Sequence, residues 1–382
     1  MESKLAKIAR LIVSIAAIVV IAAGITALFL PFWTYADDSV FIFNAIPRMI
    51  DAISRASDGN ADMKVKMIAY MFGVVAFVVF AIIILIAGIK LLIEAIKNLK
   101  AQGELNTKAY AGFIAVLALY SFVLGSFNPA YYYTAIGPKL MASMAITGIT
   151  TLAAHRVLHA IDNKLKGKDL AGIIILAVIP IILITAVTNF SGNILIYSDS
   201  DAYRYSVYGM FFRRIKDLIV NNSNSSAGTF IFALIKCLTS AIIITVTCAL
   251  TAAMATKPYK QQENIRNGKP LLVVSIIATV LSSIAAIIYL NHAGTADFIG
   301  IVLSFGFCIA ASIVGMILVG KEEKKEEKEV AKAEKVEEAE PVEEAPAEEQ
   351  QAEEAAPSED NVTGEESVDI GEAGDAGVGD VE

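Results

Sequence analysis

Lys236 lies well inside a segment that is apolar enough to cross a membrane. It follows the start of that segment, at Gly228, by eight residues, which is about 12 Å along a helix. A charge at that depth is costly, so its default interpretation is functional: a counter-ion for a ligand or a charge in a channel. Two structural alternatives remain. Either the side chain reaches back to the membrane surface, or the helix begins later, because Cys237 to Ala255 alone would span.

Three possible metal ligands, His155, His159 and Asp162, fall at positions i, i+4 and i+7 near the end of the fourth apolar segment. This spacing places them on one face of a helix, and all three are ligand types that zinc accepts. Arg156 and three nearby lysines favour instead a helix end that faces lipid headgroups. We therefore expect a polar cluster here and no metal site.

Catalytic motifs are missing from the sequence. It has no phosphate-binding glycine loop, no CxxC pair and no nucleophile with an evident base. Its apolar segments contain no Asp or Glu, which argues against a carrier coupled to protons or sodium ions. We therefore expect a protein that is not an enzyme, that needs no cofactor and that binds no nucleic acid.

Four aromatic residues, Trp33, Tyr35, Tyr203 and Tyr205, lie in two long loops and form a candidate surface for an outer partner. In each loop, aromatic and β-branched runs flank an Asp-rich turn, which predicts a β-hairpin. A short amphipathic helix follows each hairpin. The apolar positions of the two helices are Ile46, Met49, Ile50 and Ile53 in the first loop and Phe211, Ile215, Leu218 and Ile219 in the second.

The sequence leaves two arrangements of these loops open. In one, the amphipathic helices rest with their apolar faces on the membrane surface or on the top of the helix bundle. In the other, the two hairpins pair with each other into one small sheet, which forms an exterior platform for a partner. Mutual pairing is attractive because an isolated two-stranded hairpin is marginally stable in water.

Eight apolar segments must position these groups. They begin near Ala9, Met67, Ala109, Lys139, Leu170, Gly228, Leu271 and Phe298. The last four starts follow the first four by 161, 161, 162 and 159 residues, and this agreement predicts an internal duplication. We therefore expect an all-α integral membrane protein whose eight transmembrane helices form two tandem four-helix repeats. Each repeat carries an outer loop with a β-hairpin and an amphipathic helix.

The C-terminal part has a composition of its own. It holds 24 acidic and 6 basic residues and no aromatic residue, which predicts a largely disordered acidic tail. The expected parts are the first repeat at 1–162 with its outer loop at 32–66, a cytoplasmic linker at 163–169, the second repeat at 170–320 with its outer loop at 191–227, and the tail at 321–382.

Basic residues predict the orientation, because short loops rich in Lys and Arg stay in the cytoplasm. The N-terminus and the connections Lys90–Lys108, His155–Asp169 and Thr256–Pro270 hold three or four basic residues each. The connections 128–138 and 291–297 hold none. We therefore expect a protein of the cell membrane with both its N-terminus and its C-terminus in the cytoplasm.

Two functions fit this sequence. The first is a non-enzymatic membrane scaffold or interaction subunit, with membrane lipids around it and a protein partner at the outer loops or the acidic tail. The alternative is a transporter or channel for a small or lipid-like solute, with its site between the two repeats near Lys236.

Overall fold

The computed structural model describes residues 4–35, 38–57, 61–100, 105–128, 133–192, 195–198, 202–220, 227–260, 268–289, 293–294 and 296–337. The chain divides into two compact units, Met1–Val330 and Ala331–Glu382. The second unit is described only as the end of a helix that continues to Glu337. The tail predicted to be disordered therefore lies, from residue 338 on, outside the described residues. All that follows concerns the first unit.

The order of elements repeats along the chain. A helix, two strands, three helices, one strand and a final helix occur twice in succession. The first series is α1 (Lys4–Ala27), β1 (Trp33–Tyr35), β2 (Asp38–Val40), α2 (Ile42–Ser57), α3 (Ala61–Lys100), α4 (Lys108–Ser126), β3 (Tyr133–Thr134) and α5 (Ile136–Asp162). The second is α6 (Gly167–Asn189), β4 (Leu195–Ser198), β5 (Ala202–Tyr205), α7 (Val207–Val220), α8 (Ala227–Lys260), α9 (Lys269–Tyr289), β6 (Ala293–Gly294) and α10 (Ala296–Glu337). We call these series the first and second halves.

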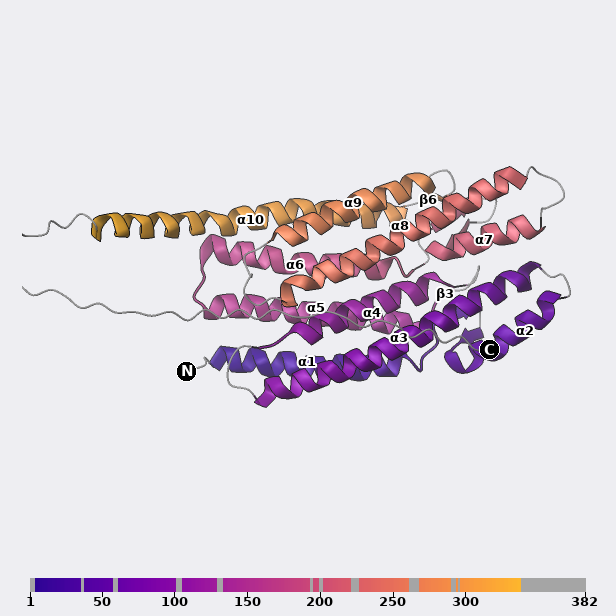
Figure 1. The fold of residues 1–382 in the computed structure, drawn as a ribbon, viewed down its shortest axis with the longest axis horizontal. Coiled ribbons are helices and arrows are strands. Elements are labelled where there is room, and N and C mark those ends of the chain that lie inside the picture. Colours follow the sequence, from indigo (N-terminus) through magenta and orange to yellow (C-terminus); the bar gives the residue numbers. More distant parts are fainter. Residues whose placement is uncertain are drawn as a thin grey trace, which may run out of the picture. The chain divides into compact units, whose positions relative to one another are not determined.

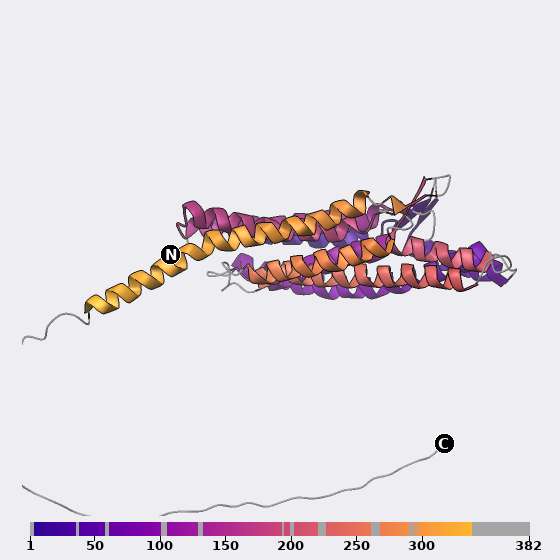
Figure 2. The same ribbon diagram turned by 90° about the horizontal axis from the view of Figure 1, so that it is seen from above.

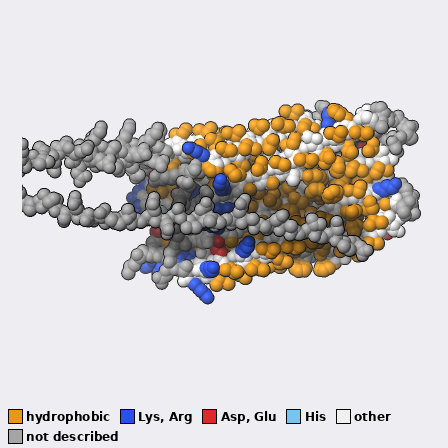
Figure 3. All heavy atoms as spheres, in the orientation of Figure 1, with side chains coloured by type: hydrophobic (Ala, Val, Ile, Leu, Met, Phe, Trp, Pro, Cys, Tyr) orange, Lys and Arg blue, Asp and Glu red, His pale blue; other side chains and the backbone are white. Residues whose placement is uncertain are grey.

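Seven of the described helices are long and apolar enough to cross a membrane: α1, α3, α4, α6, α8, α9 and α10. The chain is therefore a largely helical, multi-pass membrane protein. The long helices run side by side (Figure 1) and lie in two layers (Figure 2). On the face drawn in Figure 3, hydrophobic side chains cover most of the described surface, and Lys and Arg gather mainly toward the ends. The helix α5 is not among the seven, because Lys139, His155 and Arg156 interrupt its apolar sequence.

Each half contains a three-stranded antiparallel sheet, in the order β2-β1-β3 and β5-β4-β6. The registers correspond: Trp33 pairs with Val40 and Thr134, and Ile196 pairs with Arg204 and Gly294. The hairpins predicted from the sequence are present, but of the two arrangements left open, the one in which the hairpins pair with each other is not the one observed. Each hairpin instead gains its third strand from a short loop of its own half. We call the end of the long helices that carries these sheets the sheet end (Figure 1).

The amphipathic helices pack against long helices at the sheet end. α2 contacts α3, and α7 contacts both α8 and α3. This arrangement is possible because α3 has 40 residues and α8 has 34, whereas about 20 suffice to cross a membrane. The extra turns extend each long helix and give the short helix a surface on which to pack.

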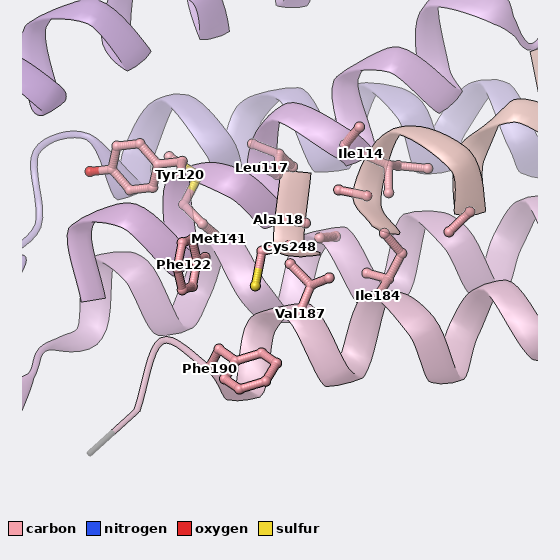
Figure 4. Packing of buried hydrophobic residues seen from close by; sticks show 14 of the residues in the cluster. Ile114, Leu117, Ala118, Tyr120, Phe122, Met141, Ile184, Val187, Phe190 and Cys248 are labelled. Carbon is pink, nitrogen blue, oxygen red and sulfur yellow. The ribbon is translucent and has the colours of Figure 1, made fainter. Parts of the chain in front are cut away.

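α4 forms the centre of the unit and contacts α3, α5, α6 and α8. In the close view of Figure 4, Ala118 and Phe122 of α4 lie beside side chains of the second half, among them Cys248 of α8, Val187 of α6 and Phe190 just past the end of α6. All five are buried. At the far end of α4 from the sheets, the Glu94 carboxylate of α3 accepts hydrogen bonds from the first backbone N–H groups of α4, which would otherwise lack partners. The two halves are thus joined by packed side chains around α4.

Candidate functional site

Lys236 lies on α8, and its side chain is half-buried. Its ammonium nitrogen stands 4.7 Å from the ring centre of Phe232, which is one turn nearer the sheet end and is 61% exposed. The charge is therefore directed along the helix toward the sheet end, where a cation over an aromatic ring can also meet water. This placement favours the interpretation in which Lys236 reaches the membrane surface.

His155 and His159 lie one turn apart on α5, with ring centres 6.4 Å from each other. The Nδ1 atom of His159 is 3.2 Å from the side-chain nitrogen of Asn163. In the described part of the chain, no group of three His, Cys, Asp or Glu side chains could hold a metal ion. The helical spacing thus places His155, His159 and Asp162 on one helix without assembling a metal-binding geometry.

His155 instead lines a groove of about 410 Å³ between α1 and α5. Its walls are apolar except for His155 and three threonines, of which Thr150 and Thr151 donate hydrogen bonds to carbonyls of their own helix. The groove belongs to the first half, and it therefore differs in position from the site between the repeats that the sequence suggested.

Two of the four aromatic residues predicted to form an outer partner surface are buried, so that prediction is wrong for them. Trp33 is fully buried, and its indole Nε1 donates a hydrogen bond to the backbone oxygen of Leu124 at 2.6 Å. Tyr205 is 2% exposed. The reason is the pleat of a sheet that lies on the helix ends, which turns alternate side chains toward the helices. Tyr35 and Tyr203 lie in β1 and β5, but their side chains lie outside the described part.

A different surface is exposed at the sheet end. Phe43, Ile46, Ile50 and Ile53 of α2 are 70%, 45%, 59% and 46% exposed. They follow one another at three- and four-residue steps and therefore form one continuous apolar stripe, which we call the α2 stripe. The helix packs with a neighbouring face, whose buried residues are Ala45, Ala52 and Ala56. The sequence signal for this face is the spacing of the alanines, because small residues allow helices to approach closely.

The matching positions of α7 have a different environment. α2 begins at Ile42 and α7 at Val207, so Ile46 and Ile50 correspond to Phe211 and Ile215. Both of these α7 residues are half-buried and pack against the hydrophobic core, as does Ile219. The apolar face is thus covered in the second half and uncovered in the first.

Polar side chains join the halves at the sheet end. The Ser206 hydroxyl, at the start of α7, donates toward the backbone oxygen of Ser126 at 2.8 Å and the side-chain oxygen of Asn128 at 2.6 Å. Thr134 of β3 bonds the backbone oxygen of Ser191 at 2.6 Å. All of these side chains are buried. These contacts, which the sequence did not predict, fix the two sheets relative to α4.

The charges at the sheet end also differ between the halves. In the first half Asp38 of β2 pairs with Arg48 of α2, and the hydrogen bond from this guanidinium lowers the pKa of the carboxyl below its ordinary value. In the second half two guanidiniums, those of Arg213 and Arg214, lie 3.3 Å from the same carboxylate, Asp217. Arg48 thus ties α2 to its sheet, whereas Asp217 forms its pairs within α7.

No protein-family model matches this chain, and no significant similarity to a curated protein or to a solved structure was found. The functional argument therefore rests on the geometry of the chain itself.

Proposed function

We propose that this chain is a non-enzymatic membrane scaffold or interaction subunit. It has eight transmembrane helices in two tandem repeats, and it presents the α2 stripe to a protein partner outside the cell. Both termini lie in the cytoplasm in this proposal, in keeping with the basic residues of the connections at the opposite end from the sheets. The membrane is the cell membrane.

Two observations support the eight spans and the duplication. The element order and the strand registers correspond between the halves. Trp33, Val40 and Thr134 of the first half correspond to residues 163, 164 and 160 positions later in the chain, which are Ile196, Arg204 and Gly294. The eighth span is α5, whose 27 residues extend about 40 Å and contact α1, α4 and α6. Its Arg156 is tolerable in a membrane because it is covered: it is 6% exposed, and its guanidinium lies 5.7 Å from the ring centre of Tyr259.

The observation that carries the function is the exposure of the α2 stripe. Its first residue, Phe43, stacks on Phe29, just past the end of α1, with ring centres 6.4 Å apart. Ile53 lies ten residues further, about 15 Å along the helix. α2 packs on α3, whose 40 residues exceed the ~20 that cross a membrane, so in this proposal the stripe lies beyond the lipid, where a contiguous apolar patch in water marks an interaction site.

Site-specific photo-crosslinking in native membranes tests the proposal. A photoreactive residue at position 50 should capture a protein, because Ile50 is 59% exposed and lies at the middle of the stripe. The control is the same residue at position 55, since Arg55 is an exposed residue on the opposite face of α2. Capture of lipid alone at position 50, or equal capture of protein at both positions, would overturn the proposal.

The groove between α1 and α5 favours a second candidate, a carrier for a lipid-like solute. Its apolar walls and single histidine suit an acyl chain with a polar head. Flux of a fluorescent phospholipid in liposomes distinguishes the candidates. If the chain is a carrier, the unmodified protein moves the phospholipid, and Thr150→Trp abolishes this flux because it fills the groove. If the chain is a scaffold, neither the unmodified protein nor the Thr150→Trp variant produces flux.

A further inference from the structure

We propose that the groove between α1 and α5 retains an acyl chain of one anionic phospholipid, whose phosphate lies at the end of these helices opposite the sheets. In the proposed orientation this lipid belongs to the inner leaflet. The site is separate from the α2 stripe, so the inference does not depend on the scaffold proposal. It also differs from the carrier alternative, because the lipid is held and not moved.

The groove opens toward lipid. α1, which forms one wall, is long and apolar enough to cross a membrane. Its wall residue Ile12 is 51% exposed, and Ile8, Leu11 and Ile15 beside it are exposed as well. Exposed isoleucine and leucine side chains of a spanning helix lie in hydrocarbon, so an acyl chain and not water is what reaches the groove.

The length of the groove fits an acyl chain of one leaflet. Its α5 wall extends from Ile146 to Leu158, which is about 18 Å along a helix. One leaflet contributes about 15 Å to the hydrocarbon core. The groove therefore accommodates one chain and does not extend across the membrane, which favours retention over transport. Because Thr150 and Thr151 donate to carbonyls of their own helix, hydrocarbon can cover these hydroxyls without breaking a hydrogen bond.

One end of the groove is polar. His155 lines it, and the ring of His159 follows one turn further along α5, with ring centres 6.4 Å apart. The side-chain amide nitrogen of Asn163 lies 3.2 Å from Nδ1 of His159. An amide nitrogen can only donate, so in the neutral imidazole the proton lies on Nε2. His159 is exposed, and its Nε2–H can therefore donate to a phosphate oxygen.

Basic side chains surround the same end of both walls. Five exposed lysines lie there: Lys4 and Lys7 at the start of α1, and Lys164, Lys166 and Lys168 just after the end of α5 or in the first turn of α6. Residues 155–169 contain the carboxylates of Asp162 and Asp169, of which Asp169 is buried. The excess of positive charge complements an anionic headgroup whose acyl chain enters the groove.

Photolabelling of the full chain in liposomes tests the site. The probe is a phosphatidylglycerol with a diazirine at the end of one acyl chain, diluted in phosphatidylcholine, and mass spectrometry locates the adducts. Adducts should form on the groove residues Val13 and Ile146 several-fold more than on Ile93 of α3, which is 49% exposed outside the groove. Thr150→Trp should reduce the groove adducts several-fold, and the matched control Ile93→Trp should leave them unchanged.

A phosphatidylcholine with the same diazirine tests the headgroup. In the unmodified protein the phosphatidylglycerol probe should label the groove several-fold more than this second probe. The variant Lys164→Gln, Lys166→Gln should remove the preference and leave the labelled positions the same, because the groove itself is intact. Equal labelling by both probes in the unmodified protein would overturn the proposal. Adducts spread evenly over the groove and Ile93, or groove adducts that survive Thr150→Trp, would also overturn it.

Two other occupants are distinguished by further measurements. A photoreactive residue in place of Ala154, which is exposed in the groove, should capture lipid in native membranes. Capture of a second copy or of another protein would show that a helix fills the groove, and the proposal would be wrong. Phospholipid flux that Thr150→Trp abolishes would show that the lipid is moved and not retained. The scaffold proposal is tested separately at position 50, so the two can fail independently.

Discussion

α4 and α9 occupy the same place in the two halves, but α4 lies inside the unit and α9 at its surface. In the most apolar 18-residue stretch of each helix, 72% of the residues of α4 are buried, compared with 33% of those of α9. Positions counted from their starts at Lys108 and Lys269 show how the sequences differ: Ala115 of α4 is buried, and the corresponding Ile276 of α9 is 43% exposed. At this pair of positions a small residue occurs where helices meet, and a β-branched residue occurs where the surface is open to lipid.

The comparison of α2 with α7 has a different lesson. Both helices keep an apolar face, although only that of α7 is covered. For α9, lipid explains the exposed isoleucines. In the proposed arrangement α2 extends beyond the membrane, so lipid cannot cover the α2 stripe. A protein partner has to cover it instead.

The sheet of the first half depends on Trp33. Replacement by Ala should reduce the free energy of unfolding by about 3–5 kcal/mol, because it empties a buried aromatic site and leaves the Leu124 carbonyl without its indole donor. Unfolding by SDS titration in mild detergent measures this change. The control is Phe43→Ala, at a position that is 70% exposed. Equal losses in the two variants would contradict the anchoring role of Trp33.

Exchanging residues between α4 and α9 tests their different environments. Gly125 and Ala286 both lie 17 positions after the start of their helix. A Cβ at Gly125 would stand 2.5 Å from the backbone oxygen of Ser191, so Gly125→Ala should cost about 1–3 kcal/mol, although Ala is the better helix former. The reverse change, Ala286→Gly, should cost about 0.5–1 kcal/mol. The same titration measures both, and a stabilising Gly125→Ala would show that the ends of α4 and α6 are not in contact.

The smallest effect concerns the ion pair of the first half. The pKa of Asp38 is lowered in the folded protein. The ion pair therefore stabilises the fold fully at pH values above 3.8, the ordinary pKa of the carboxyl, and this contribution is lost as the pH falls through the lowered pKa. Asp38→Asn should therefore cost about 0.2–1 kcal/mol at pH 7 and nothing at pH values at which Asp38 is protonated, since the pair is partly exposed. Stability measured across this range checks the sign. A difference that persists at low pH would mean that Asp38 acts through packing.

Local patterns predicted much of this fold. Long apolar segments, alternating aromatic residues and Asp-rich turns indicated the membrane-length helices and both hairpins. The third strands could not be predicted, because β3 and β6 have only two residues each and too few positions to show alternation. The burial of Trp33 and Tyr205 depends on which side of each sheet meets the helices. That choice depends on long-range packing, such as the bond from Trp33 to Leu124, which no local pattern contains.

The proposed eight spans and two equivalent halves require α5 to cross the membrane. Cysteine labelling on either side of α5 shows whether it does. Tyr133, just before α5, is 54% exposed, and Lys166, just after it, is also exposed. In intact cells a membrane-impermeant maleimide should label Tyr133→Cys, and it should label Lys166→Cys only after lysis. Labelling of both variants from the same side would show that α5 does not cross, and the eight-span duplication would be wrong.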